Sequence, residues 1–88
     1  MSQEQVLVVD DEEVMRDVLG SVLGQAGYDV TFAETGVRGV ELARRGSYAA
    51  AIVDVMLPEM GGLEVLEEIK KHDPEMVVLM ITAFASME

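Results

Sequence analysis

Short apolar runs that end at a polar side chain constrain the fold of this 88-residue chain more than any other feature. The runs cover residues 6–9, 50–53 and 76–81. Asp10, Asp54 and Thr82 follow them directly. Continuous apolar runs with β-branched residues are typical of strands that are covered on both faces, as in parallel sheets. Because the carboxyl ends of parallel strands meet at one edge, where open α/β sheets bind ligands, we expect these polar side chains to share one site.

The segments between these runs have helical periodicity. Residues 13–25 place apolar side chains on one helical face, and Gly27 is suited to end this helix in a left-handed conformation. The apolar side chains are those of Val14, Val18, Leu19, Val22 and Leu23. Thr35 can cap a second helix, and a third helix begins near Leu63.

A further strand is predicted between the first two helices, where residues 28–33 alternate between polar and apolar side chains. Strands that alternate with helices predict right-handed crossovers and a parallel sheet with helices on both faces. We therefore expect an α/β fold in which residues 1–88 form one small domain.

Composition excludes several classes of function. The sequence has 17 acidic and 6 basic residues, and its net charge of −11 repels phosphate backbones and anionic lipid. We therefore expect neither nucleic-acid binding nor membrane binding. The chain has no cysteine, so a thiolate metal site and a cysteine nucleophile are excluded. No run is long enough to span a bilayer, and residues 1–5 do not resemble a secretory leader, so we expect a cytoplasmic protein.

The acids at the predicted sheet edge indicate a metal site. Asp10, Asp11 and Asp54 would repel one another and raise each other's affinity for protons unless a cation lay among them. Mg²⁺ suits such a site, because it is a hard ion that prefers oxygen ligands. With the ion bound, the Asp54 carboxylate can attack phosphorus, and the Thr82 hydroxyl is a suitable donor to the transferred group. The simpler interpretation is that Asp54 caps the next turn and that Asp11 favours the positive end of a helix dipole.

Three segments resemble the receiver domain of two-component response regulators. They are VVDDEE at residues 8–13, IVDVMLPEMGGLE at residues 52–64 and MITA at residues 80–83. The resemblance implies a flavodoxin-like, doubly wound parallel sheet, for which the strand order 2-1-3-4-5 is known. In this chain the sheet would stop after the fourth strand, with the order 2-1-3-4.

The resemblance also implies a role for each residue of the site. Asp54 would accept a phosphoryl group from the phosphohistidine of a sensor histidine kinase. Asp10, Asp11, Asp54 and the backbone carbonyl of Met56 would bind Mg²⁺, and Thr82 would move toward the phosphate. Such a domain is a phosphoacceptor that assists its own phosphorylation and dephosphorylation, rather than an enzyme.

This sequence departs from the family pattern in two places. Gly61 stands where the family usually has an acidic residue, so the cap of the third helix is weaker or comes from the backbone. The chain also ends at Glu88, so residues 1–88 would form an incomplete receiver domain without the fourth helix, the fifth strand with its lysine and switch aromatic, and the fifth helix. Lys70 and Lys71 cannot replace that lysine, because both belong to the third helix.

A receiver cut after its fourth strand would expose that strand. Residues 76–81 are all apolar, and an exposed edge of this kind invites pairing with another chain, so we expect a homo-oligomer that forms through the fourth strand. The last residues, 81–88, are similar to receivers that precede ATPase-type transcription activators of the nitrogen-regulation group.

Two other functions stay open on the sequence alone. A magnesium-dependent phosphatase with an aspartyl nucleophile would have a similar fold, but such enzymes usually carry Asp-x-Asp after the first strand, where this chain has the adjacent pair Asp10 and Asp11. An interaction stub that neither binds metal nor takes phosphate is the other alternative. The absent lysine favours the stub, and the intact set of acids argues against it.

Overall fold

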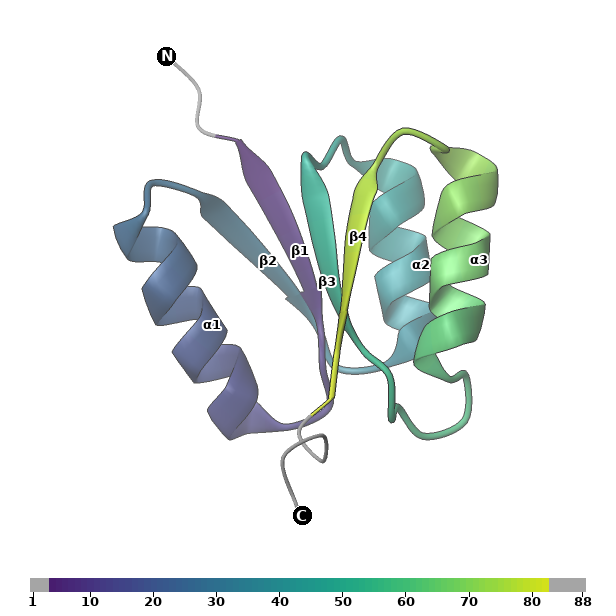
Figure 1. Ribbon diagram of the computed structural model, residues 1–88, viewed down its shortest axis with the longest axis horizontal. Helices are drawn as coiled ribbons and strands as arrows, with labels where there is room; N and C mark the ends of the chain where they lie inside the picture. Colours follow the sequence, from purple (N-terminus) through teal and green to yellow (C-terminus); the bar gives the residue numbers. More distant parts are fainter. Residues whose placement is uncertain (1–3, 83–88) are drawn as a thin grey trace.

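The computed structural model describes residues 4–82, which form a parallel sheet flanked by helices (Figure 1). In chain order the elements are β1 (Gln5–Val9), α1 (Glu13–Gln25), β2 (Asp29–Ala33), α2 (Gly36–Arg45), β3 (Ala50–Asp54), α3 (Gly62–His72) and β4 (Val77–Ile81). The strands and helices predicted from the sequence are therefore confirmed.

The sheet has four strands in the order β2-β1-β3-β4, and every neighbouring pair is parallel. This order confirms the predicted doubly wound arrangement. The register pairs Val9 with Ala33 and with Val53, and it pairs Asp54 with Ile81. The carboxyl ends of all the strands therefore lie at one edge of the sheet, as predicted.

The main core lies between the sheet and the pair α2 and α3, which cover the same face (Figure 1). Its buried members come from β1, β2 and β3, from both helices and from the connections that follow β3 and α3. They are Leu7, Val9, Ala33, Val40, Ala43, Ala51, Val53, Leu57, Val65, Ile69 and Met76. This face explains why β1 and β3 have continuous apolar runs, since both central strands are covered there and also contribute to the second face.

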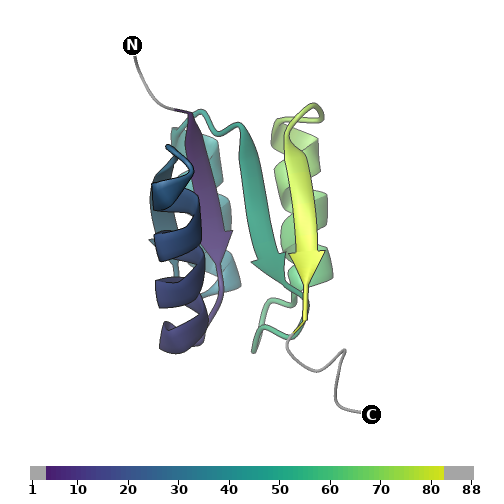
Figure 2. The same ribbon diagram turned by 60° about the vertical axis from the view of Figure 1, so that its left-hand side comes forward.

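The second face is covered only in part. Val6, Val8 and Ile52 form a smaller cluster with the half-buried Leu19 and Leu23 of α1. In Figure 2 α1 lies over the half of the sheet that contains β1 and β2, and among residues 4–82 no helix covers β3 and β4 on this face.

The predicted apolar face of α1 is therefore only half right. Val14, Val18 and Val22 are 75%, 51% and 59% exposed, although they belong to the same periodic pattern as Leu19 and Leu23. Leu19 and Leu23 pack against the cluster of Val6, Val8 and Ile52, whereas the three valines stay exposed on the same helix.

The predicted helix ends are confirmed. The Thr35 hydroxyl oxygen accepts a hydrogen bond of 3.1 Å from the N–H of Arg38, which caps α2. Gly27 follows α1 with φ at 98°, a left-handed conformation that favours glycine. Gly61 precedes α3 without a side-chain cap, as the absent acid predicts. In the described part of the chain no helix is long and apolar enough to cross a bilayer.

Candidate functional site

Asp10 is fixed at the end of β1 by its backbone and its side chain together. Its N–H donates a hydrogen bond of 3.0 Å to the carbonyl of Ala33, which ends β2. Its Oδ1 accepts a hydrogen bond of 2.9 Å from the N–H of Glu12, so the chain turns sharply before α1. Only 2% of Asp10 is exposed. A carboxylate in this position has little freedom to choose another rotamer.

Asp54 is held in the same way at the end of β3. Its Oδ1 accepts a hydrogen bond of 3.0 Å from the N–H of Met56, and 7% of the residue is exposed. The next residue, Val55, donates its N–H to the carbonyl of Ile81 at 2.8 Å, which ties the turn to the end of β4. Thr82 follows Ile81 directly, so it lies at the same sheet edge as Asp54.

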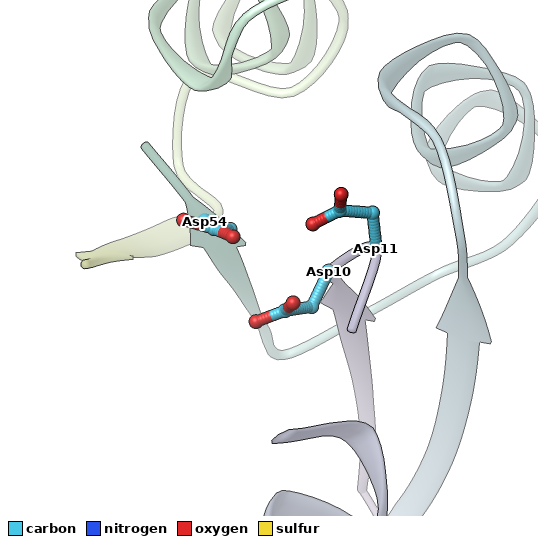
Figure 3. A group of neighbouring side chains, drawn as sticks. All are labelled: Asp10, Asp11 and Asp54. Atoms are coloured by element: carbon cyan, nitrogen blue, oxygen red, sulfur yellow. The ribbon is translucent and has the colours of Figure 1, made fainter. Parts of the chain in front are cut away.

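The structure brings the three predicted acids together. Asp10, Asp11 and Asp54 each offer a carboxylate oxygen, and these oxygens all lie within 4.8 Å of one another. Figure 3 shows the three side chains side by side at the ends of β1 and β3. Asp11 is exposed, whereas Asp10 and Asp54 are buried, so the group is open to solvent on the side of Asp11.

The electrostatics of this group favour a cation. Burial raises the pKa of the Asp10 carboxyl above its ordinary value, and the negative charges of Asp54, Asp11 and Glu12 raise it further. The hydrogen bond from the Glu12 N–H works in the opposite direction. The protein therefore holds charge in a place where that charge is unfavourable, and a positive ion would relieve this cost.

The donor set fits Mg²⁺. All the candidate donors are carboxylate oxygens, which are the hard ligands that this ion prefers, and one or two carboxylates with several waters are its usual protein ligands. Asp10 and Asp54 each use Oδ1 to accept a hydrogen bond from a backbone N–H. These backbone bonds orient the carboxylates, as outer-shell contacts do in metal sites.

Two predicted site residues lie near the acids, but their roles stay predictions. Met56 is two residues beyond Asp54 and donates its N–H to the Asp54 carboxylate, so its backbone belongs to the same turn. A role for its carbonyl as a metal ligand is untested. The same holds for Thr82 as a residue that moves toward phosphate.

The turn after β3 depends on a glycine that the sequence interpretation treated only as a chain breaker. A Cβ at position 62 would collide with the Asp54 carbonyl oxygen and lie 2.8 Å from the Val55 Cα. Gly62 therefore lets α3 begin directly against the Asp54 backbone. Glu59, in the same turn, has φ at 63°, which is unusual for a residue other than glycine. The Gly61-Gly62 pair was the available sequence signal.

Lys70 lies at the opposite end of α3 from the acids. Its Nζ donates hydrogen bonds to the carbonyls of Met76 at 2.6 Å and Pro74 at 3.2 Å, where the chain enters β4. Lys71 pairs with Glu68 on the same helix at 3.2 Å. Both contacts agree with the interpretation that neither lysine serves the site.

The sequence interpretation also missed Arg16. Its guanidinium donates a hydrogen bond of 2.8 Å to the backbone carbonyl of Asp10, and its side chain is 16% exposed. The only signal in the sequence was a basic residue in the first turns of a helix that follows a pair of acids.

Comparison with known proteins gives one consistent result. A family model described as the response regulator receiver domain matches residues 6–88. YkoG of Bacillus subtilis, an uncharacterized transcriptional regulatory protein, is 40% identical over 83 residues, which are 94% of this chain and 36% of YkoG. The chain thus spans about a third of the length of this relative.

Solved structures agree with the sequence matches. A CheY-like response regulator receiver domain protein of Methanospirillum hungatei has a TM-score of 0.91 at 34% identity, and the alignment covers 98% of this chain and 69% of that one. The response regulator TrrA of Thermotoga maritima, in complex with Mg²⁺ and BeF, has a TM-score of 0.90 at 34% identity over 94% of this chain and 72% of TrrA. TrrA has also been solved in complex with the histidine kinase ThkA, where the TM-score is 0.87.

Proposed function

This chain belongs to the response regulator receiver domain family, and from that premise we propose that Asp54 accepts a phosphoryl group from a histidine kinase. One observation carries the proposal. The buried Asp54 carboxylate lies at the end of a central strand, within 4.8 Å of two further carboxylates that can hold Mg²⁺. The hydrogen bond that the Met56 N–H donates to Oδ1 orients this carboxylate.

In the proposed step an Asp54 oxygen attacks the phosphorus of a phosphohistidine. A new O–P bond forms, the N–P bond to the imidazole breaks, and the bond's electron pair stays with the imidazole nitrogen, which then takes up a proton. Apart from the bond that Asp54 forms, the protein assists such a transfer by positioning the reacting groups and by stabilising the charge on the phosphoryl group. The fixed rotamer of Asp54 supplies the positioning.

A bound Mg²⁺ would neutralise the negative charge that gathers on the transferred group. Asp10 and Asp11 would hold it together with Asp54, and we include the Met56 carbonyl in the proposed ligand set. Thr82 is the proposed hydroxyl donor to the phosphate, because it follows the residue that pairs with Asp54 in the sheet. The neighbour TrrA, which was solved with Mg²⁺ and BeF, supports this arrangement.

The proposed partner is a sensor histidine kinase, and the support for it is the complex of TrrA with ThkA. A cytoplasmic location belongs to the same proposal. We do not favour a phosphatase, because the acids on β1 are adjacent and the proposed nucleophile is on β3. Since a receiver domain accepts a phosphoryl group, we propose that this one acts as a phosphoacceptor and not as an enzyme.

The experiment is mass spectrometry of the native chain after incubation with a small phosphodonor and Mg²⁺. We expect one adduct on Asp54 that is labile to acid and to base, as an acyl phosphate is, and that is absent from Asp54→Asn and strongly reduced in Asp11→Ala. The matched control is Asp29→Asn, since Asp29 lies at the opposite end of the sheet, paired with Gln5. An adduct that persists in Asp54→Asn would overturn the proposed phosphoacceptor.

We also propose that the chain forms a homo-oligomer through β4. This strand is the last in the order of the described sheet, and its Val77 and Leu79 are 55% and 53% exposed. An edge strand offers unpaired backbone groups to a second strand, and a second copy of this chain brings an identical edge. The self-association that follows is a property of the whole molecule.

A further inference from the structure

Arg16 joins three parts of the chain behind the acid site. It lies near the start of α1, it donates through one guanidinium nitrogen to the Asp10 carbonyl at 2.8 Å, and its other terminal nitrogen lies 3.8 Å from a Glu34 carboxylate oxygen. Glu34 is the first residue after β2. Arg16 is only 16% exposed, whereas Glu34 is 76% exposed, so the bond to Asp10 is the sheltered and stronger contact.

These contacts close a ring. The N–H of Asp10 donates to the carbonyl of Ala33, Glu34 is the next residue along the chain, and Arg16 connects Glu34 back to the Asp10 carbonyl. Both backbone groups of Asp10 are therefore used, and its Oδ1 holds Glu12. Without Arg16 the Asp10 carbonyl would lose its protein partner in this ring. The turn that carries Asp10 and Asp11 would then be held to β2 only by the hydrogen bond from the Asp10 N–H to the Ala33 carbonyl.

We propose that Arg16 is a positioning residue that fixes the turn after β1, so that the Asp10 and Asp11 carboxylates stay close enough to Asp54 to share one divalent cation. The inference rests on the proposed function, because it assumes the Mg²⁺ site. Arg16 touches neither the cation nor the phosphoryl group in this account. It acts through the backbone of Asp10, as outer-shell partners do when they orient metal ligands.

The sign of the effect separates positioning from charge. A guanidinium cation repels Mg²⁺, so removal of its charge alone would tighten Mg²⁺ binding. Loss of positioning has the opposite effect, because Asp10 and Asp11 would then sample arrangements that cannot share the ion with Asp54. Arg16→Met, which keeps much of the apolar stem and removes the charge and the fork, therefore gives a clear answer.

The test is isothermal titration calorimetry of Mg²⁺ against the full chain at constant ionic strength. We expect Arg16→Met to weaken Mg²⁺ binding and so to raise the Kd by roughly 10-fold or more, the usual size of an outer-shell effect. Arg16→Lys keeps the charge but lacks the planar guanidinium group that reaches two partners. We therefore expect a higher Kd than in the parent for this variant too. The control is Arg38→Met, since Arg38 is 51% exposed and pairs with Glu41 on α2.

A Kd that is unchanged or tighter in Arg16→Met would overturn the inference, as would a parent-like Kd in Arg16→Lys. Circular dichroism in EDTA shows whether each variant folds. If Arg16→Met does not fold, the Kd of Arg16→Lys decides the question. A lower melting temperature in EDTA with an unchanged Kd would assign Arg16 a structural role only. Absence of Mg²⁺ binding by the parent would overturn the proposed metal site, and this inference with it.

Discussion

Asp10 is 2% exposed, and it lies beside two other acids. Burial and the neighbouring charges raise the pKa of its carboxyl above the ordinary value of 3.8. As the pH rises from 3.8 through the higher pKa of the folded state, the Asp10 carboxyl loses its proton in the unfolded chain before it does so in the folded protein. The folded state then binds more protons, so its stability falls with rising pH, and the full cost is present at neutral pH.

Asp10→Asn should therefore stabilise the protein in EDTA. Asn keeps an oxygen that can accept the Glu12 N–H, and it has no charge to desolvate. We expect the melting temperature to rise by several degrees at neutral pH, since about 1 kcal/mol corresponds to about 4–8 °C in a domain of this size. The gain should shrink as the pH approaches 3.8, the ordinary Asp value.

Thermal melts over a pH series, with and without Mg²⁺, check this prediction. With Mg²⁺ the order should reverse, because the parent gains stability from the ion that it binds and the variant loses a ligand. Asp29→Asn, at the exposed start of β2, should show neither effect. A gain that grows toward acid pH would contradict the sign that we derive for Asp10.

At the scale of the elements, the start of α3 is fixed by the close approach of Gly62 to the Asp54 backbone. A methyl group at position 62 would meet the Asp54 carbonyl oxygen and the Val55 Cα, which are backbone atoms that cannot rotate away. We expect Gly62→Ala to lower the free energy of unfolding by about 1–3 kcal/mol, the usual cost of overpacking. It should also slow phosphorylation, because Asp54 would have to shift.

Gly24→Ala is the matched control. Gly24 lies in α1, and apart from its chain neighbours and the backbone of its own helix, no heavy atom lies within 4 Å of the position that its Cβ would take. Since Ala favours a helix over Gly by roughly 0.5–1 kcal/mol, this variant should be more stable than the parent. Urea unfolding of both variants measures the two signs. Equal effects at positions 24 and 62 would show that the contact at Gly62 has no energetic weight.

The sequence predicted the elements well because their signals are local. An apolar run, a Thr35 cap and a left-handed Gly27 each depend on a few neighbouring residues, and all of them are confirmed. The convergence of Asp10, Asp11 and Asp54 followed from the parallel order of the strands. The contact of Arg16 with the Asp10 carbonyl could not be predicted, because a long flexible side chain can reach many partners and no periodicity indicates which one.

At the scale of the whole molecule, local sequence patterns do not predict how much of each face of the sheet is covered. Helical periodicity placed Val14, Val18 and Val22 on one face with Leu19 and Leu23, and the structure exposes the three valines. Their coverage depends on what lies beside α1, and that is a property of the assembled sheet. The predicted domain boundary, and the absence of a fourth helix, fifth strand and fifth helix, stay predictions. The similarity of residues 81–88 to nitrogen-regulation receivers falls mainly outside the described residues.

The face of the sheet that α1 covers only in part has an apolar surface beside the edge strand β4. A groove between α1 and β4 is lined by Val6, Leu23, Ile52 and Leu79. Burying an exposed aliphatic side chain is worth roughly 1.5–3 kcal/mol, which is large beside the ~5–15 kcal/mol that stabilises a typical domain. The net charge of −11 opposes association of two copies, and salt screens this repulsion.

We therefore expect self-association that strengthens with protein concentration and with salt. Leu79→Lys should shift the molecule toward a monomer, because a charged side chain on an edge strand opposes pairing with another strand. Val37→Lys is the control, since Val37 is 51% exposed on α2, at the other face, close to the 53% of Leu79. Size exclusion with light scattering, over a dilution series at two salt concentrations, measures the mass. A folded parent that stays monomeric at every concentration, with a sharp thermal transition, would show that the four strands are stable with one face only partly covered.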